Sequence, residues 1–162
     1  MGSKAYLAMA LLLYTGQRRS DVVKLGRQHI GKDGKLHFTQ SKNEKRQHKR
    51  MAIPILPVLQ EALELVPAGQ LTFLQTQFGK PHTPAGFGGW FRRRCDEACC
   101  PDVSAHGLRK IGADMGLTDR ELMAIAGHET TSETSRYTKG RDRELLAESG
   151  MAKLTSLRIG LS

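Results

Sequence analysis

The residue types best suited to chemistry lie in the C-terminal part of the chain, within SAHGLRKIGADMGLTDRELMAIAGHETTSETSRYTKG. His106 and Arg109 are three residues apart, so on a helix both side chains share one face and can reach one ligand. His128 follows an apolar helical pattern that Gly127 can end, and Tyr137 comes nine residues later in a polar, basic setting.

A guanidinium, two imidazoles and a phenol together are suited to a phosphodiester. A guanidinium grips two phosphate oxygens in a fork, imidazoles donate or shuttle protons, and a phenol can attack phosphorus. Taken singly, each residue has a simpler explanation, because an isolated histidine or tyrosine is more often a surface or packing residue. The order and spacing of the whole set favour the chemical interpretation.

The order His-x-x-Arg, then Gly-His, then a lone tyrosine resembles that of the tyrosine recombinases (phage integrase family). The resemblance implies a site-specific recombinase that needs neither metal nor cofactor. Tyr137 would attack DNA, form a 3′-phosphotyrosine and release a 5′-hydroxyl. The resemblance also implies that His106 acts as the base, that Arg109 stabilises the phosphate and that His128 hydrogen-bonds a phosphate oxygen.

Two further segments resemble parts of the same family pattern. The string TGQRRSDVVKL looks like the family's first box, which assigns Arg18, not Arg19, as the second catalytic arginine. The alternative is that both arginines are solvated surface charges. Where Arg18 is the catalytic residue, Asp21 is expected to be a structural partner that caps the helix or orients Arg18. The family also has a lysine on a hairpin that protonates the leaving oxygen; this corresponds to Lys42, with Lys45 as the alternative.

Composition constrains the partner and the compartment. The 162 residues fit one domain, and 25 Lys and Arg against 16 Asp and Glu give a net charge of +9. This excess favours a polyanionic partner, although ribosomal and membrane-surface proteins can share it. No apolar run is long enough to span a membrane. We expect a cytoplasmic, nucleoid-associated protein that binds double-stranded DNA, and the resemblance implies a homotetramer on that DNA.

Two basic segments are candidates for contacts with the DNA backbone. One is the polar loop SKNEKRQHKR, and the other is the basic edge of a helix containing FRRRC. Both can equally be solvated charge, but backbone contacts add affinity without reading sequence. The candidates are Lys45, Arg46, Lys49, Arg92, Arg93 and Arg94.

Hydrophobic periodicity and turn residues predict the elements that position these side chains. The fold class is mainly α with a small antiparallel β-sheet. Residues 71–74 are a possible third strand, and FGKPHTPAGFGG is expected to be a connecting loop. The predicted helices are 4–14, 17–25, 58–66, 90–100, one from Ser104, one from Thr118 and 141–154; the predicted strands are 35–40 and 50–55.

The spacing between the two C-terminal boxes departs from the family. Only eighteen residues separate Arg109 from His128, about one helical turn fewer than the resemblance implies. Glycines make this segment a poor helix, so we predict that the helix of His106 ends near 114–116. A helix that begins with the capping box Thr118-x-x-Glu121 should remain intact and carry His128 to the arginines. The Tyr137 segment should be mobile or displaced without DNA.

The resemblance also sets the expected domain organisation. Residues 4–154 should form the catalytic domain, residues 1–3 resemble a cloning scar, and residues 155–162 should be a flexible tail. The separate N-terminal core-binding domain of most members is expected to be absent from this chain. The alternatives are an inactive DNA-binding member of the fold, a type IB topoisomerase, which shares the chemistry but not the compact box, and an RNA-binding protein.

Overall fold

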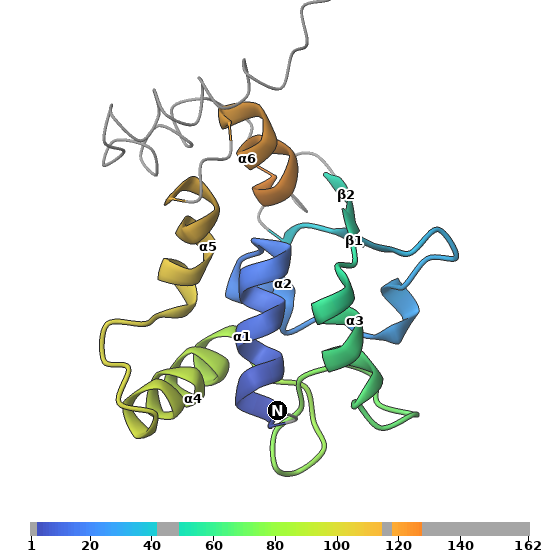
Figure 1. The fold of residues 1–162 in the computed structure, drawn as a ribbon. Coiled ribbons are helices and arrows are strands. Elements are labelled where there is room, and N and C mark those ends of the chain that lie inside the picture. The colour runs from blue at the N-terminus through green and yellow to red at the C-terminus, as the bar shows by residue number, and fades with distance from the viewer. Residues whose placement is uncertain (1–2, 42–48, 115–117, 128–162) are drawn as a thin grey trace, which may run out of the picture.

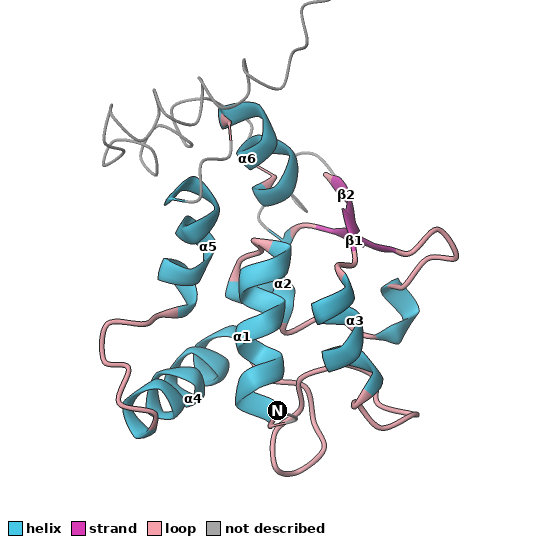
Figure 2. Cartoon of the chain, viewed as in Figure 1, coloured by secondary structure: helices cyan, strands magenta, loops and turns pink. Residues whose placement is uncertain are grey.

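The computed structural model describes residues 3–41, 49–114 and 118–127. These residues form a set of helices with a two-stranded antiparallel sheet at one side (Figure 2), which confirms the predicted fold class. The elements are α1 (Lys4–Thr15), α2 (Arg19–Val22), the 3-10 helix η1 (Arg27–His29), β1 (Lys35–Thr39), β2 (Arg50–Pro54), α3 (Pro57–Glu64), α4 (Pro84–Glu97), α5 (Ala105–Asp114) and α6 (Asp119–Ala126).

Helix α1 is the centre of the fold. It lies between α4 and α5 on one side and α3 and the sheet on the other (Figure 1). Leu7, Leu11 and Leu12 are buried on several of its faces, as expected for a helix that is apolar nearly all round. Ser3 caps its start, and Gly16 ends it in the left-handed conformation, with φ 63°.

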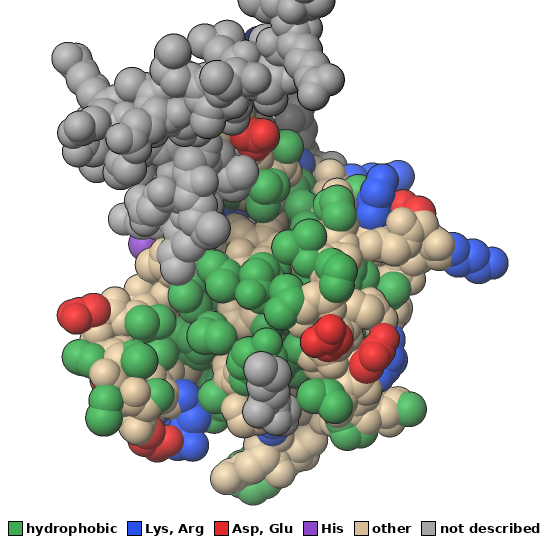
Figure 3. Space-filling model, viewed as in Figure 1, with side chains coloured by type: hydrophobic (Ala, Val, Ile, Leu, Met, Phe, Trp, Pro, Cys, Tyr) green, Lys and Arg blue, Asp and Glu red, His purple; other side chains and the backbone are tan. Residues whose placement is uncertain are grey.

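The sheet is the predicted hairpin. Strands β1 and β2 pair antiparallel, with Lys35 opposite Pro54 and Thr39 opposite Arg50. Leu36 and Ile53 form one of the pairs and are both buried, so this hairpin face closes over the core. On the face of the molecule shown in Figure 3, hydrophobic side chains gather over the middle, where Figure 1 places α1 and α3.

The predicted helix over residues 17–25 is wrong in extent, because only the single turn α2 is helical. A distant segment meets the chain where the helix was expected to end. The amide of Phe73 donates to the carbonyl of Leu25 at 2.8 Å. A Cβ on Gly26 would lie 2.2 Å from the carbonyl oxygen of Leu71, so the two backbones are in close contact. This crossing ends the helical path.

The possible third strand at residues 71–74 is not a strand in the structure. Thr72, Phe73 and Leu74 are buried in an irregular segment. Its hydrogen bonding is local or directed to Leu25, as in the bond from the Thr72 hydroxyl to the carbonyl of Leu74 at 2.9 Å. An apolar run of this length fits any buried segment, so it did not distinguish a strand from packed loop.

The expected loop before residue 90 is wrong, because α4 already begins at Pro84. Thr83 caps this helix by accepting from the amide of Gly86 at 3.1 Å, and proline suits the first helical position. Phe87 is fully buried and anchors the first turn in the core. Burial of Phe87 and the cap therefore outweigh the low helix propensity of the glycines.

The caps predicted for the two following helices are confirmed. The Ser104 hydroxyl accepts from the amide of Gly107 at 2.9 Å. Helix α5 is described as far as Asp114, and the predicted helix end near 114–116 extends beyond the described residues. Thr118 and Glu121 form the reciprocal capping box of α6. Gly127 then ends α6 in the left-handed conformation, with φ 68°.

The three cysteines are free thiols at the end of α4. Cys95 is buried in the core, and this burial raises the pKa of its thiol, which makes it an unreactive packing residue. Cys99 and Cys100 are exposed beyond the helix end.

Candidate active site

Arg18 stands at the start of α2. Gly16 turns the chain out of α1, and Arg18 takes an extended conformation at the N-cap position of α2. Its side chain is half-buried, and no side-chain hydrogen bond or ion pair joins it to another described residue. The guanidinium is therefore held near the protein surface with its donors available to a ligand.

His106 and Arg109 share one face of α5, as their spacing predicted. Arg109 is 6% exposed, and its Nη2 donates to the carbonyl of Ala126 at 2.7 Å. This bond joins α5 to the end of α6. A buried guanidinium fixed in this way is preorganised, because its orientation does not have to be established when a ligand binds.

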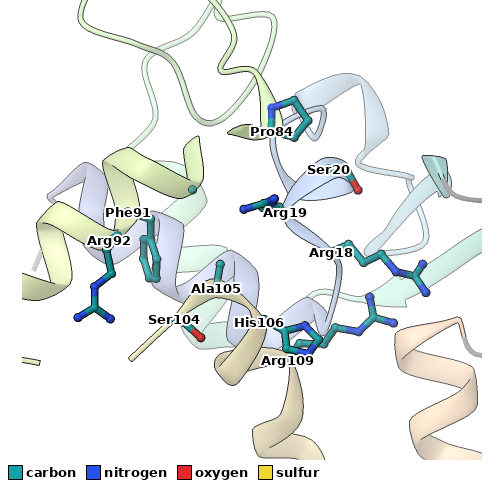
Figure 4. A pocket seen from close by; sticks show the side chains of 11 residues that line it. Arg18, Arg19, Ser20, Pro84, Phe91, Arg92, Ser104, Ala105, His106 and Arg109 are labelled. Atoms are coloured by element: carbon teal, nitrogen blue, oxygen red, sulfur yellow. The ribbon is translucent and has the colours of Figure 1, made fainter. Parts of the chain in front are cut away.

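Arg18, His106 and Arg109 come together in one pocket. The guanidinium groups of Arg18 and Arg109 point toward each other, and the imidazole of His106 lies beside Arg109 (Figure 4). The pocket has a volume of about 670 Å³, and none of the described residues that line it is acidic. It is lined by Arg18, Arg19, Ser20, Pro84, Gly88, Phe91, Arg92, Ser104, Ala105, His106 and Arg109. This arrangement is suited to an anion with several oxygens, such as a phosphate.

Two buried glutamines that the sequence analysis did not single out support this site. Gln40 Nε2 donates to Gln17 Oε1 at 2.7 Å and to the carbonyl of Ala126 at 3.0 Å. Gln17 Nε2 donates to the carbonyl of Ile125 at 2.6 Å. The pair thus holds the end of α6 against the segment that carries Arg18. No local pattern marks such a pair, because its members belong to separate elements.

Asp21 is a structural partner, but of a different element than expected. Its carboxylate is 2% exposed, and Oδ1 accepts from the backbone amide of Ser41 at 2.7 Å. No ion pair joins it to Arg18 among the described residues. Asp21 therefore ties α2 to the end of β1, next to the predicted position of the lysine.

Several predicted site residues lie outside the described part of the chain. They are Lys42, Lys45, Arg46, His128 and Tyr137. Lys49 is described and half-buried just before β2, where its carbonyl accepts from the amide of Gln40 at 3.2 Å. The roles of these five residues and of Lys49 therefore remain predictions.

The three consecutive arginines of α4 have different surroundings. Arg92 lines the cationic pocket and pairs with Asp96 at 2.8 Å. Arg93 is exposed and lines a separate hollow with Lys80 and Trp90. Arg94 pairs with Glu97. Of the three, Arg92 alone lines the pocket of Arg18 and Arg109.

The fold and the pocket define a helical domain with a hairpin and a pair of convergent arginines. The sequence matches the model of the family described as the phage integrase family over residues 2–144, a range that contains every predicted catalytic residue. The chain belongs to the phage integrase family. A comparison with curated proteins gave no significant match.

Solved structures share this fold. A lambda integrase tetramer bound to a Holliday junction is 23% identical, with a TM-score of 0.66, over 86% of this chain and 44% of that one. The XerA recombinase is 16% identical, with a TM-score of 0.71, over 93% and 58%. The lambda integrase catalytic core is 24% identical, with a TM-score of 0.61, over 77% and 83%. This chain therefore spans about half the length of the longer structures.

In the part of the chain that the structure describes, no helix is both long and apolar enough to cross a lipid bilayer.

Proposed function

We propose that this chain is the catalytic domain of a site-specific DNA recombinase that cuts and rejoins DNA through a 3′-phosphotyrosine intermediate. The observation that carries the proposal is the convergence of Arg18, His106 and Arg109 in one pocket whose described lining holds no acidic residue. Membership of the phage integrase family supports it.

The positions of Arg18, His106 and Arg109 support a chemical role for each of them. The transition state of phosphoryl transfer gains negative charge on its non-bridging oxygens. Arg18 and Arg109 stabilise that charge, and one preorganised donor of this kind contributes on the order of 3 kcal/mol. A free phenol has a pKa of about 10, so the nucleophile needs a base or a strongly positive site. We assign this role to His106, and its position beside Arg109 supports the assignment.

The proposed reaction is a reversible exchange of esters. The Tyr137 oxygen forms a bond to phosphorus while the bond from phosphorus to the 5′-oxygen breaks. The phenolic proton passes to His106, and Lys42 donates a proton to the leaving 5′-oxygen. His128 hydrogen-bonds a phosphate oxygen. A 5′-hydroxyl of a second strand then attacks the phosphotyrosine and reverses these transfers, so no external energy source is needed.

The same proposal covers domain extent and assembly. Residues 4–154 form the catalytic domain, which binds double-stranded DNA and acts as a homo-oligomer on it. Lambda integrase, which shares the fold, forms a tetramer on a Holliday junction. The positive charge of +9 supports a DNA partner.

A covalent-trapping experiment tests the proposal. The chain is incubated with a pool of nicked duplexes of randomised sequence, in which cleavage near the nick releases a short strand and prevents religation. Denaturing gels should then show a protein–DNA adduct that protease removes. Tyr137→Phe should still bind DNA and form no adduct, while Tyr14→Phe, in α1, should still form it.

The other outcomes are equally informative. DNA binding without an adduct from the parent chain would indicate an inactive, DNA-binding member of the fold. An adduct that survives Tyr137→Phe would assign the nucleophile to another residue.

A further inference from the structure

Arg19 is a second arginine of the pocket to which the proposed chemistry gives no role. It is exposed, it lines the same pocket as Arg18, and no side-chain hydrogen bond or ion pair joins it to a described residue. The two adjacent side chains point in opposite directions: Arg18 toward Arg109, and Arg19 toward α4 (Figure 4). Arg19 therefore cannot share the oxygens held by Arg18 and Arg109 without leaving its observed position.

The position of Arg19 depends on a glycine of α4. A Cβ built on Gly88 would lie 2.7 Å from Arg19 Nη1, so the end of this side chain would have to shift. The guanidinium thus lies directly over the helix backbone at a position without a side chain. On Gly89, the next residue, a Cβ would meet nothing within 4 Å.

The pocket has room for more than one phosphate. Its volume of about 670 Å³ extends from Arg18 and Arg109 to α4, where Phe91 and Gly88 line it. A water molecule takes up about 30 Å³ in the liquid. Five atoms of that size, the number in one phosphate group, would fill only a fraction of the pocket. The Ser104 hydroxyl and the N-terminal end of α5 line the same pocket and add favourable polarity for an anion.

We propose that Arg19, seated over Gly88, forms a second phosphate subsite that binds the DNA phosphate neighbouring the one held by Arg18 and Arg109. This inference rests on the proposed function in that the polyanion is DNA. A strand presents its charges at regular short intervals, so a cation pointing away from the first phosphate is placed to meet the next. Arg19 fixes the register of the strand and takes no part in the chemistry.

Salt titration of DNA binding tests the subsite, with a duplex of random sequence as the probe. Each phosphate contact contributes about 0.9 to the slope of log affinity against log salt. Arg19→Gln should reduce that slope by about 0.9, so its affinity deficit should shrink about 3.5-fold between about 50 and 200 mM salt. A purely structural role of Arg19 would lower affinity without changing the slope.

Gly88→Ala and Gly89→Ala are a matched pair in the same helix. Both replace glycine with a better helix former, so neither should lower the melting temperature. Gly88→Ala should displace the Arg19 guanidinium and reduce the slope, and Gly89→Ala should leave it unchanged. In the Arg19→Gln background, Gly88→Ala should have no further effect on binding, because both changes act through one contact.

An unchanged salt slope in Arg19→Gln overturns the subsite, and so does an additive loss in the Gly88→Ala, Arg19→Gln double variant. These results are independent of covalent trapping. A chain that forms no adduct yet shows the predicted slopes would lose its proposed recombinase chemistry and keep the subsite.

Discussion

The buried side chain of Gln40 donates to Gln17 Oε1 at 2.7 Å across 23 residues of sequence, and both glutamines also bond carbonyls at the end of α6. Gln17 directly precedes Arg18, and Gln40 follows the last residue of β1. This single buried pair therefore joins the segment that carries Arg18, the end of β1 and the turn at Gly127. Fixing all three relative to one another is a precondition for a preorganised site.

The first prediction concerns the glutamine pair. Gln40→Leu leaves Gln17 Oε1 buried without its donor, which should lower the free energy of unfolding by about 1–3 kcal/mol. Gln60→Leu is the control, because Gln60 is exposed on α3 and bonds Glu64 at 2.9 Å; its effect should stay within about 0.5 kcal/mol. Urea unfolding measures both.

The glutamine pair should also show coupling. The double change Gln17→Leu, Gln40→Leu should cost less than the sum of the single changes, because each single change already breaks the shared bond. Strict additivity would mean that the two side chains do not depend on each other.

The second prediction concerns Gly127, whose φ is 68°. A Cβ there would lie 2.3 Å from Gln40 Nε2, whereas at Gly34, with φ 71°, it would meet nothing within 4 Å. Gly34→Ala should therefore cost only the left-handed strain of about 1–2 kcal/mol. Gly127→Ala should cost more, because it also displaces Gln40. Equal losses in thermal or urea unfolding would contradict the contact with Gln40.

The third prediction separates the two arginines that we propose to be catalytic. Arg18→Ala and Arg109→Ala should each slow adduct formation by on the order of 100-fold, since each removes one preorganised donor. Arg109→Ala should also lower the free energy of unfolding by about 1–3 kcal/mol, because Arg109 is buried and bonded to Ala126. Arg18→Ala should change it by less than about 0.5 kcal/mol.

The readouts for these arginines are single-turnover trapping on a nicked duplex and urea unfolding of the same samples. If both variants were destabilised equally, slow cleavage could be attributed to unfolding, and the distinction between a surface donor and a buried one would be lost.

The fourth prediction concerns the capping box of α6. Thr118→Ala removes the acceptor for the amide of Glu121 at 3.2 Å and should cost about 1 kcal/mol. Thr118→Ser keeps the hydroxyl and should cost less. Hydrogen exchange of the Leu122 amide is a local readout, and it should rise in the alanine variant. Unchanged exchange there would show that packing alone holds the first turn of α6.

Local chemistry alone was enough to predict much of the fold. Helix α1, the hairpin of β1 and β2, the serine cap of α5 and the capping box of α6 depend on neighbours within a few residues, so their patterns are visible in sequence. The placement of His106 and Arg109 on one helical face follows from the same short-range geometry.

Features that depend on contacts between segments remote in sequence were decided only by the tertiary structure. The crossing of Phe73 over Leu25 shortened a predicted helix, and burial of Phe87 made a helix from a glycine-rich stretch expected to be loop. The pairing of Gln17 with Gln40 and the position of Arg19 over α4 likewise join separate elements. Buried polar groups and close backbone contacts find their partners only when the chain is packed, because those partners are remote in sequence.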